Sequence, residues 1–240
     1  MTAILTCQEL FRNFNGFALQ NLSFSLEKGY LTGLIGKNGA GKTTLLKILA
    51  GLDSKFQGDV RIQGISLKAH PQKARELIGY VSEDLQLFWE KSIAENGAIL
   101  GQYFPDYDEA YFKMWLDRME LRSHTPVHQL SKGNRMKCFC CLALSHHPKL
   151  LLLDEPSAGF DPIFRKDFLS ILQTLIEEGI TIFMSSHVTE DLDKIADHIL
   201  YLEKGWLLYK ASIEEFREKN PHQKLSAVFP DTVRIQDLLP

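Results

Sequence analysis

The sequence predicts an α/β protein with a mostly parallel β-sheet at its core, and two observations carry that prediction. Short, strongly apolar runs occupy positions 31–35 and 150–153, and each ends abruptly in glycines or carboxylates. Runs of this length and composition are typical of strands that are buried on both faces of a parallel sheet. Helical patterns separate the strand-like runs, as the crossover connections between parallel strands require.

The first run leads directly into a glycine-rich loop, G-K-N-G-A-G-K-T-T at 36–44. It fits the P-loop template G-x-x-x-x-G-K-[ST], in which glycines let backbone N–H groups turn toward phosphates. A helical pattern ending at Gly51 follows, so the phosphates would lie at a helix N-terminus, with Lys42 at the β- and γ-phosphates and Thr43 on Mg²⁺. A chance glycine-rich turn, the alternative, would not explain the strand before and the helix after. We therefore expect a nucleoside triphosphate to contact Gly36, Asn38, Gly39, Gly41, Lys42, Thr43 and Thr44.

The second run, L-L-L-L-D-E-P at 150–156, ends in two carboxylates. A buried parallel strand that ends there delivers Asp154 and Glu155 to the carboxyl edge of the sheet, where open α/β sheets bind ligands. We expect Asp154 to hold the Mg²⁺ shell and Glu155 to polarise the attacking water. Two solvated surface acids are the alternative, and the P-loop elsewhere in the chain argues against it.

The remaining pattern predicts a β-rich flank, a nucleotide-binding sheet and an inserted helical region. Strands of the flank are expected at 4–11, 19–26 and 60–63, and those of the sheet at 30–35, 78–81, 150–153, 180–184 and 199–202. The pattern turns helical between about 92 and 146, most clearly at 92–104 and 108–119. Ser212 and Glu215 form a capping box that opens a last short helix. We expect one domain over 1–220, with a helical subdomain at about 84–148, and a short tail over 221–240.

Further motifs complete a family pattern. L-S-K-G-N-R at 130–135 resembles the L-S-G-G-Q signature of the ATP-binding cassette (ABC) ATPases, and it precedes the D-E strand as theirs does. The segment 157–161 resembles their D-loop, 185–187 resembles their switch-histidine loop, and Phe14 lies where an aromatic that stacks on adenine is expected. The resemblance runs from Ile4 to about Arg217. It implies a P-loop NTPase core of the ABC ATPase type, with a flanking antiparallel β-subdomain and an inserted helical subdomain.

The same resemblance implies ATP and Mg²⁺ as cofactors and a second ABC ATPase subunit, identical or different, as partner. Each ATP would lie between the P-loop of one subunit and Ser131 and Gly133 of the other. His187 would contact the γ-phosphate and orient the water beside Glu155, and Asp161 would link the two sites.

Two departures from the family pattern concern residues near the phosphates. Glu83, in I-G-Y-V-S-E at 78–83, stands where Gln is usual, and Lys132 and Asn134 replace a Gly and the Gln of the signature. A carboxylate is still an oxygen ligand for Mg²⁺, so Glu83 joins Thr43 and Asp154 as an expected metal ligand. Similar variants are familiar among ATPases of ABC-2-type exporters, which favours export over import.

Composition limits what the chain does alone. No window holds the ~18 to 20 uninterrupted apolar residues that a membrane span needs, and the N-terminus lacks the pattern of an export signal. A net charge of −3 without a basic block gives nucleic-acid binding little electrostatic support. We expect a cytoplasmic protein, peripheral on the inner face of the cell membrane through a separate transmembrane permease, which the family resemblance implies. The cargo is left open because its contacts belong to the permease.

Two rival classes stay open. One is a soluble ABC ATPase acting on DNA or ribosomes, although the chain has neither an inserted long coiled coil nor a second cassette. The other is a nucleotide-dependent scaffold without hydrolysis, which Glu155, His187 and Lys42 argue against.

Two segments allow two interpretations each. Three cysteines at 138–141 lie near two histidines, which suggests a metal site, but C-x-C-C is not a usual zinc spacing and the apolar helical pattern favours small buried thiols. The loop D-L-Q-L-F-W-E-K at 84–91 is unusually apolar, so Phe88 and Trp89 either fold into the subdomain core or await the permease.

Overall fold

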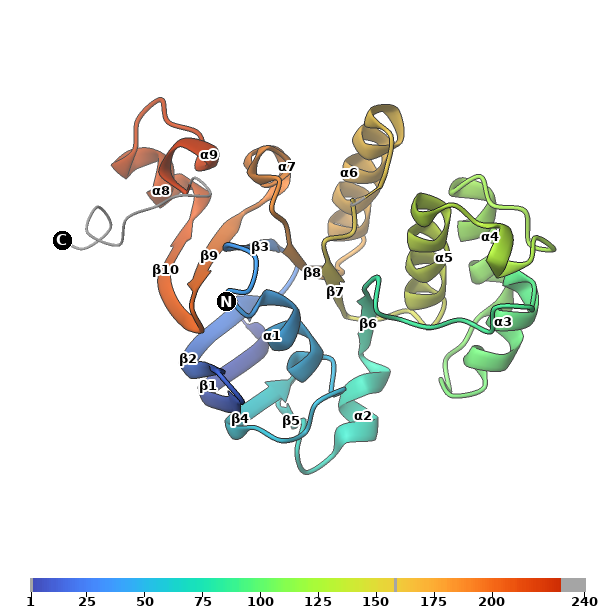
Figure 1. Cartoon of the computed structure of the whole chain (residues 1–240), viewed down its shortest axis with the longest axis horizontal. Coiled ribbons are helices and arrows are strands. Elements are labelled where there is room, and N and C mark those ends of the chain that lie inside the picture. Colours follow the sequence, from blue (N-terminus) through green and yellow to red (C-terminus); the bar gives the residue numbers. More distant parts are fainter. Residues whose placement is uncertain (1, 158, 230–240) are drawn as a thin grey trace.

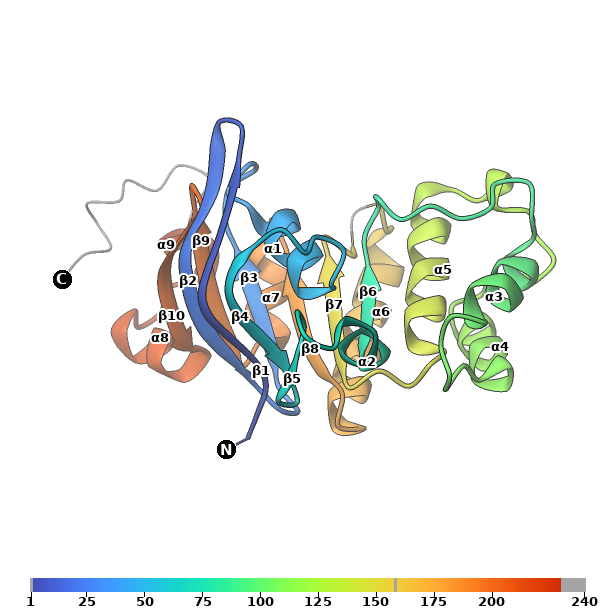
Figure 2. The same ribbon diagram turned by 90° about the horizontal axis from the view of Figure 1, so that it is seen from below.

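Two β-sheets form the centre of the protein in a computed structural model that describes residues 2–157 and 159–229. Sheet A is antiparallel, in the order β2-β1-β4-β5, and contains β1 (Ala3–Phe14), β2 (Phe17–Glu27), β4 (Gln57–Ile62) and β5 (Ile65–Ser66). Its longest strands, β1 and β2, form a hairpin that protrudes at one edge of the molecule in Figure 2.

Sheet B carries the parallel strands that the sequence predicts. It contains β3 (Leu31–Ile35), β6 (Ile78–Val81), β7 (Leu150–Asp154), β8 (Thr181–Ser185), β9 (His198–Glu203) and β10 (Trp206–Ser212), in the order β10-β9-β3-β8-β7-β6. All neighbouring pairs are parallel except β9 and β10, which form a hairpin. The strand before the P-loop, β3, therefore lies between two strands from much later in the chain.

Helices pack around sheet B, and at one end of the sheet they form a separate lobe. They are α1 (Lys42–Leu49), α2 (Pro71–Glu76), α3 (Ile93–Gly101), α4 (Glu109–Arg118), α5 (Lys132–Leu144), α6 (Pro162–Glu177), α7 (Thr189–Ile195), α8 (Ile213–Lys219) and α9 (Leu225–Val228). A 3-10 turn at Val127–Gln129 precedes α5. In Figure 1, α3, α4 and α5 form a lobe on the right, next to β6, and this lobe is the inserted helical subdomain.

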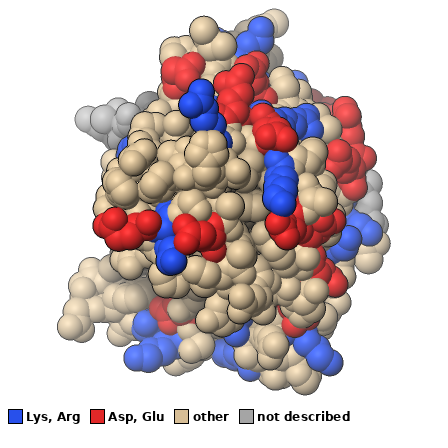
Figure 3. All heavy atoms as spheres, turned by 90° about the vertical axis from the view of Figure 1, so that its right-hand side faces the viewer, with Lys and Arg blue, Asp and Glu red and all other residues tan. Residues whose placement is uncertain are grey.

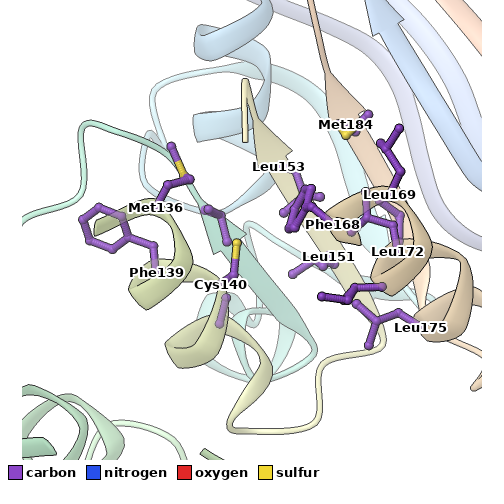
Figure 4. Packing of buried hydrophobic residues seen from close by; sticks show 14 of the residues in the cluster. Met136, Phe139, Cys140, Leu151, Leu153, Phe168, Leu169, Leu172, Leu175 and Met184 are labelled. Atoms are coloured by element: carbon purple, nitrogen blue, oxygen red, sulfur yellow. The ribbon is translucent and has the colours of Figure 1, made fainter. Parts of the chain in front are cut away.

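Three inner strands of sheet B are buried on both faces, as their apolar sequences predict. Every residue of β3, β7 and β8 is buried. Alternate residues of β7 face different cores, because Leu151 and Leu153 pack in the cluster of α5 and α6, whereas Leu150 and Leu152 pack in the cluster of α1 and sheet A. Figure 4 shows the first cluster, with β7 lying between side chains of α5 and α6.

Local signals set where the helices of the subdomain begin. Ser92 and Glu95 form a reciprocal capping box at α3, and the Asp108 carboxylate caps α4 by accepting from the Tyr111 N–H at 2.9 Å. The buried Asn96 side chain accepts from the Phe88 N–H at 2.8 Å and donates to the Phe88 carbonyl at 3.1 Å. These two bonds fix the apolar loop against α3.

The strands expected from the sequence are all present, and the capping box at Ser212 does open α8. β5, β10, α2, α6, α7 and α9 were not predicted. The boundary between a domain at 1–220 and a tail at 221–240 stays a prediction. Part of that tail packs on the sheet, because the Phe229 ring stacks 4.9 Å from the Tyr201 ring, while positions 230–240 lie outside the described residues. Among the described residues, no helix is both long and apolar enough to cross a bilayer.

Candidate nucleotide-binding site

A cleft of about 810 Å³ opens at the carboxyl ends of β3, β6, β7 and β8. This is the edge at which open parallel sheets bind ligands. Loops after four strands and the start of α5 supply its lining, which comprises Gly36, Lys37, Asn38, Thr43, Ser82, Glu83, Asp84, Lys132, Asp154, Glu155 and His187. The structure therefore brings the P-loop, both carboxylates of the D-E strand, Glu83 and His187 to one place.

The P-loop has the backbone that phosphate binding requires. Gly41 takes φ +108°, and a Cβ there would lie only 2.7 Å from atoms of Phe17 and Leu19, so a larger residue would not fit. The Lys42 ammonium donates to the Gly36 carbonyl at 2.7 Å and is buried. Because Gly41 caps α1 without a side chain, the first N–H groups of this helix have no side-chain acceptor. An anion would satisfy them.

The donors around Asp154 fit Mg²⁺. The Asp154 carboxylate is buried and accepts from the Ser185 hydroxyl at 2.7 Å. Burial raises the pKa of Asp154, although hydrogen bonds from Ser185 and Thr43 oppose this rise. A buried carboxylate beside the Thr43 hydroxyl offers the hard oxygen ligands that Mg²⁺ prefers, and the cation would offset the cost of burying the charge.

Glu155 is held at the centre of the cleft in an uncommon backbone conformation, with φ +50°. Its N–H donates to the Ser185 hydroxyl at 3.0 Å. One carboxylate oxygen accepts from the His187 N–H at 3.0 Å and lies 2.5 Å from His187 Nδ1, while the other lies 3.6 Å from the Lys42 ammonium. Glu155 and His187 thus form a hydrogen-bonded pair beside the Lys42 ammonium, which makes Glu155 a candidate general base in this cleft.

Glu83 lies in the same cleft, but its bound partner is a cation of the chain. Its carboxylate lies 2.6 Å from the ammonium of Lys132, at the first turn of α5. The pair joins the end of β6 to the helical subdomain.

Eight of the expected nucleotide contacts are not among the residues that line this cleft. Gly39, Gly41, Lys42 and Thr44 belong to the P-loop segment at 36–44, whereas the other four come from elsewhere in the chain. Phe14 is at the end of the β1–β2 hairpin, with the Arg12 guanidinium carbon 4.1 Å from its ring centroid. Ser131 caps α5, where its hydroxyl accepts from the Asn134 N–H at 3.2 Å, and Asp161 caps α6. Gly133 packs on the D-loop, since a Cβ there would lie 2.9 Å from the Gly159 carbonyl oxygen. Their predicted roles belong to a second subunit or to adenine, and they stay predictions.

The residues of the site that were not predicted as functional include Ser185, Lys37, Ser82 and Asp84. The Ser185 hydroxyl bonds both Asp154 and the backbone of Glu155, so it positions the two carboxylates together. Lys37 and Ser82 line the cleft. Ser185 is the first residue of the segment 185–187 that resembles the switch-histidine loop. The sequence therefore pointed to its place in the site but not to the groups it bonds.

Comparison with known proteins agrees with this geometry. The sequence profile of the family described as ABC transporter matches residues 19–158. The chain is 30% identical over 239 residues to the Nod factor export ATP-binding protein I of Mesorhizobium japonicum, covering 92% of this chain and 70% of that protein. An uncharacterized ABC transporter ATP-binding protein of Methanocaldococcus jannaschii is 31% identical over 206 residues, covering 84% and 74%.

Solved structures share the fold. The structure of an ATP binding subunit of an ABC transporter superimposes with a TM-score of 0.86 at 24% identity, covering 94% of this chain and 98% of that one. A dimeric ATP-binding cassette in a post-hydrolysis state, bound to ADP and Pi, gives a TM-score of 0.78 at 21% identity, covering 87% and 98%. The P-loop NTPase fold predicted from the sequence is thereby confirmed, and the chain belongs to the ABC transporter family, as an ATP-binding subunit with ATPase activity.

Proposed function

We propose that this chain hydrolyses ATP with Mg²⁺ as one of two ABC ATPase subunits and powers a separate transmembrane permease, as an exporter. The observation that carries the catalytic part is the hydrogen-bonded pair of Glu155 and His187, set beside Lys42 in the cleft. In this position Glu155 takes a proton from a water as that water attacks the γ-phosphate.

Each residue of the cleft has a separate role in this proposal. Lys42 exchanges its carbonyl acceptors for the β- and γ-phosphates, and the N–H groups at the start of α1 bind the phosphate oxygens. His187 holds Glu155 and reaches the γ-phosphate. Thr43 and Asp154 would hold Mg²⁺, which supplies a positive charge for the transferring phosphoryl group.

The active dimer places Ser131 and Gly133 of each subunit against the ATP of the other. Both residues lie at the N-terminus of α5 and are not among the residues that line their own cleft, and the N-terminus of a helix favours an anion. Asp161 lies two positions after Gly159, which packs on Gly133, so it is placed to carry contact between the two sites.

An apolar groove between the core and the helical subdomain supports the permease as partner. The groove measures about 340 Å³ and includes Leu52, Leu87 and Tyr103, of which Leu52 is 57% and Tyr103 77% exposed. Phe88 and Trp89 of the apolar loop are also about half exposed, at 50% and 52%. In related transporters a cytoplasmic helix of the permease occupies this cleft, and a helix of that kind would cover these side chains here.

Nucleic acid is not the proposed partner. The face of the helical subdomain seen in Figure 3 mixes acidic and basic side chains rather than presenting a continuous basic surface.

Export is favoured because relatives at 30% identity carry the name Nod factor export ATP-binding protein. The subunit would then lie on the cytoplasmic face of the cell membrane through its permease.

The test combines turnover with localisation. The purified chain should hydrolyse ATP only with Mg²⁺, and a tagged copy should co-purify with membranes together with one multi-span protein. The Lys42→Ala variant should lose turnover but keep the membrane partner, since Lys42 lies at the P-loop and not in the groove. Recovery with ribosomes or DNA instead of a membrane protein would contradict the proposal.

A further inference from the structure

The two departures from the family pattern face each other in the structure. Glu83 follows β6 and Lys132 opens α5, and their charged atoms lie 2.6 Å apart. Among the described residues, Glu83 forms its salt bridge with Lys132. The carboxylate and the ammonium are therefore one unit, and neither Gln nor Gly at these positions would form it.

The packing around Lys132 sets the direction of its side chain. Its methylene stem passes the D-loop, because a Cβ on Gly159 would meet the Lys132 stem at 3.4 Å. Gly159 has φ +84°, which favours glycine and keeps this passage open. The stem thus leads from the signature, past the D-loop, to Glu83 in the cleft where the phosphates are expected.

A metal ion that binds Glu83 would compete with the Lys132 ammonium for the same carboxylate. Glu83 and Asp154 line the same cleft as Thr43, so Glu83 is within the region where nucleotide-bound Mg²⁺ is expected. The ammonium of Lys132 neutralises the charge that a metal would use, and it must be displaced, or share the carboxylate, when the metal binds. Both side chains are about half exposed, 54% and 43%, so the pair is weak enough to exchange.

We propose that Lys132 is a positioning residue that competes with Mg²⁺ for Glu83. In the nucleotide-free chain the ion pair holds the N-terminus of α5 to the end of β6. When Mg²⁺ and ATP bind, Glu83 turns to the metal and the Lys132 ammonium is released beside Ser131 and Gly133. Loading of one site thereby frees a cation at the surface that meets the ATP of the second subunit. This inference rests on the proposed function.

The experiment measures how much Mg²⁺ is needed for equilibrium binding of fluorescently labelled AMP-PNP, a nucleotide that is not hydrolysed. Lys132→Met should lower the half-saturating Mg²⁺ concentration by up to about five-fold, the range of an exposed ion pair. Lys132→Arg should restore the wild-type value, because it keeps the cation. Glu83→Gln should raise the concentration, and adding Lys132→Met to it should change nothing further.

Lys47→Met is the matched control. Lys47 lies 2.5 Å from Asp84, the neighbour of Glu83, so its loss removes one positive charge near the same loop without touching Glu83. An equal shift in Lys47→Met and Lys132→Met would overturn the competition. So would a Lys132→Met effect that persists in the Glu83→Gln background, where no carboxylate is left to compete for. An unchanged Mg²⁺ titration in Glu83→Gln would do the same.

A second readout tests the holding role of the ion pair. Amide hydrogen exchange across the first turn of α5 should be faster in nucleotide-free Lys132→Met than in the nucleotide-free wild type. No difference between these two nucleotide-free proteins would count against a holding role for the ion pair. If the wild type binds no nucleotide in the presence of Mg²⁺, the proposed function itself fails; if it binds but the variants do not follow this pattern, only the role of Lys132 fails.

Discussion

At the scale of single residues, Glu155 combines an uncommon backbone conformation with contacts to a lysine and a histidine. A left-handed conformation at a non-glycine residue costs about 1 kcal/mol or more and persists only where the surroundings impose it. Here the Ser185 hydroxyl, the His187 backbone and the Lys42 ammonium all contact this one residue. The side chain is therefore held in place before any substrate arrives, which would reduce the reorganisation needed if Glu155 acts as the proposed base.

Replacement of Glu155 by Gln should lower ATP turnover by ~10²–10⁴-fold, the usual contribution of a general base. ATP affinity should stay near wild type, because Glu155 does not bind the phosphates, and the protein should accumulate as an ATP-bound dimer. Steady-state hydrolysis, nucleotide binding and size-exclusion chromatography measure the three effects. Lys42→Ala provides the contrast, since it should weaken nucleotide binding itself. More than about a tenth of wild-type turnover in Glu155→Gln would show that another group is the base.

A second residue-scale prediction concerns the support of the D-loop. The buried Asp191 carboxylate accepts from Arg165 Nε at 2.9 Å and from the Ser157 hydroxyl at 3.4 Å. Arg165→Met should lower the free energy of unfolding by about 3 kcal/mol, because it leaves a buried charge unpaired. Urea denaturation measures the loss. The double variant with Asp191→Asn should recover part of it, whereas equal stability of wild type and Arg165→Met would rule out a supporting role for the pair.

At the scale of elements, α5 connects three parts of the molecule. Its N-terminus carries the signature, its buried face packs on β6, and its other neighbours are α3 and α4. Cys138, Cys140 and Cys141 lie on this buried part, as small apolar residues between helix and sheet. The interpretation of these residues as buried thiols is confirmed by their burial.

The thiols should not react with thiol reagents in the native protein. Burial raises the pKa of Cys138 and Cys140 to about 12, so almost no thiolate is present at about pH 8. The pKa of Cys7 is raised to about 12 for the same reason. Ellman's reagent should therefore detect no thiol in the native chain and all four after denaturation. A thiol that reacts without unfolding would place a cysteine at the surface.

At the scale of the whole molecule, exposed apolar side chains gather around the groove between core and subdomain. Leu52, Tyr103, Phe88 and Trp89 belong to elements that the sequence separates but the fold brings to one end. Since Phe88 and Trp89 are about half exposed, they are not part of the subdomain core. Their backbone is nevertheless fixed by Asn96 and by the His128 N–H, so a partner would meet a prepared surface.

Trp89→Ala should weaken permease association by about 30-fold or more, as expected for an aromatic anchor worth ~2 kcal/mol. Its melting temperature should fall by only about 2–4 °C, because little beyond the Arg135 contact, 5.5 Å from the ring centroid, is lost. Pull-down and thermal denaturation together decide the question. Trp206→Ala is the matched control: Trp206 is 51% exposed on β10, at the other end of the molecule, and should leave the pull-down unchanged. A larger loss of melting temperature would show that Trp89 stabilises the fold itself, and an unaffected pull-down would remove it from the interface.

The sequence predicted those parts of the fold that local patterns encode. Buried strands such as β3 and β7 were found because uninterrupted apolar runs have few other stable positions in a globular protein. β10 was missed because only one residue of W-L-L-Y-K-A-S is buried, although exposed and less exposed residues alternate along it. In the site, the motifs located Thr43, Asp154, Glu155 and His187 in one cleft.

What the motifs could not predict are contacts between distant positions. The partner of Glu83 is a residue of α5, far along the chain, and no local rule pairs them. The same holds for the Arg12 guanidinium over Phe14, which stands where an adenine ring was expected to stack. Such contacts depend on the path of the backbone and on side-chain rotamers, which single-sequence patterns do not specify.

The position of β3 has a consequence for synthesis of the protein. The P-loop leaves the ribosome early, but β8 and β9, which flank β3 on both sides, are made much later, as is Gly205, whose N–H donates to the Ala40 carbonyl at 3.0 Å. At translation rates of about 5–20 residues per second, β3 waits roughly ten to thirty seconds for its neighbours. During that interval an apolar strand with two open edges is exposed to wrong pairing and aggregation. We therefore expect the nascent chain to need chaperones until β8 and β9 emerge, and a product truncated before these strands to lack the support that β3 and the P-loop have here.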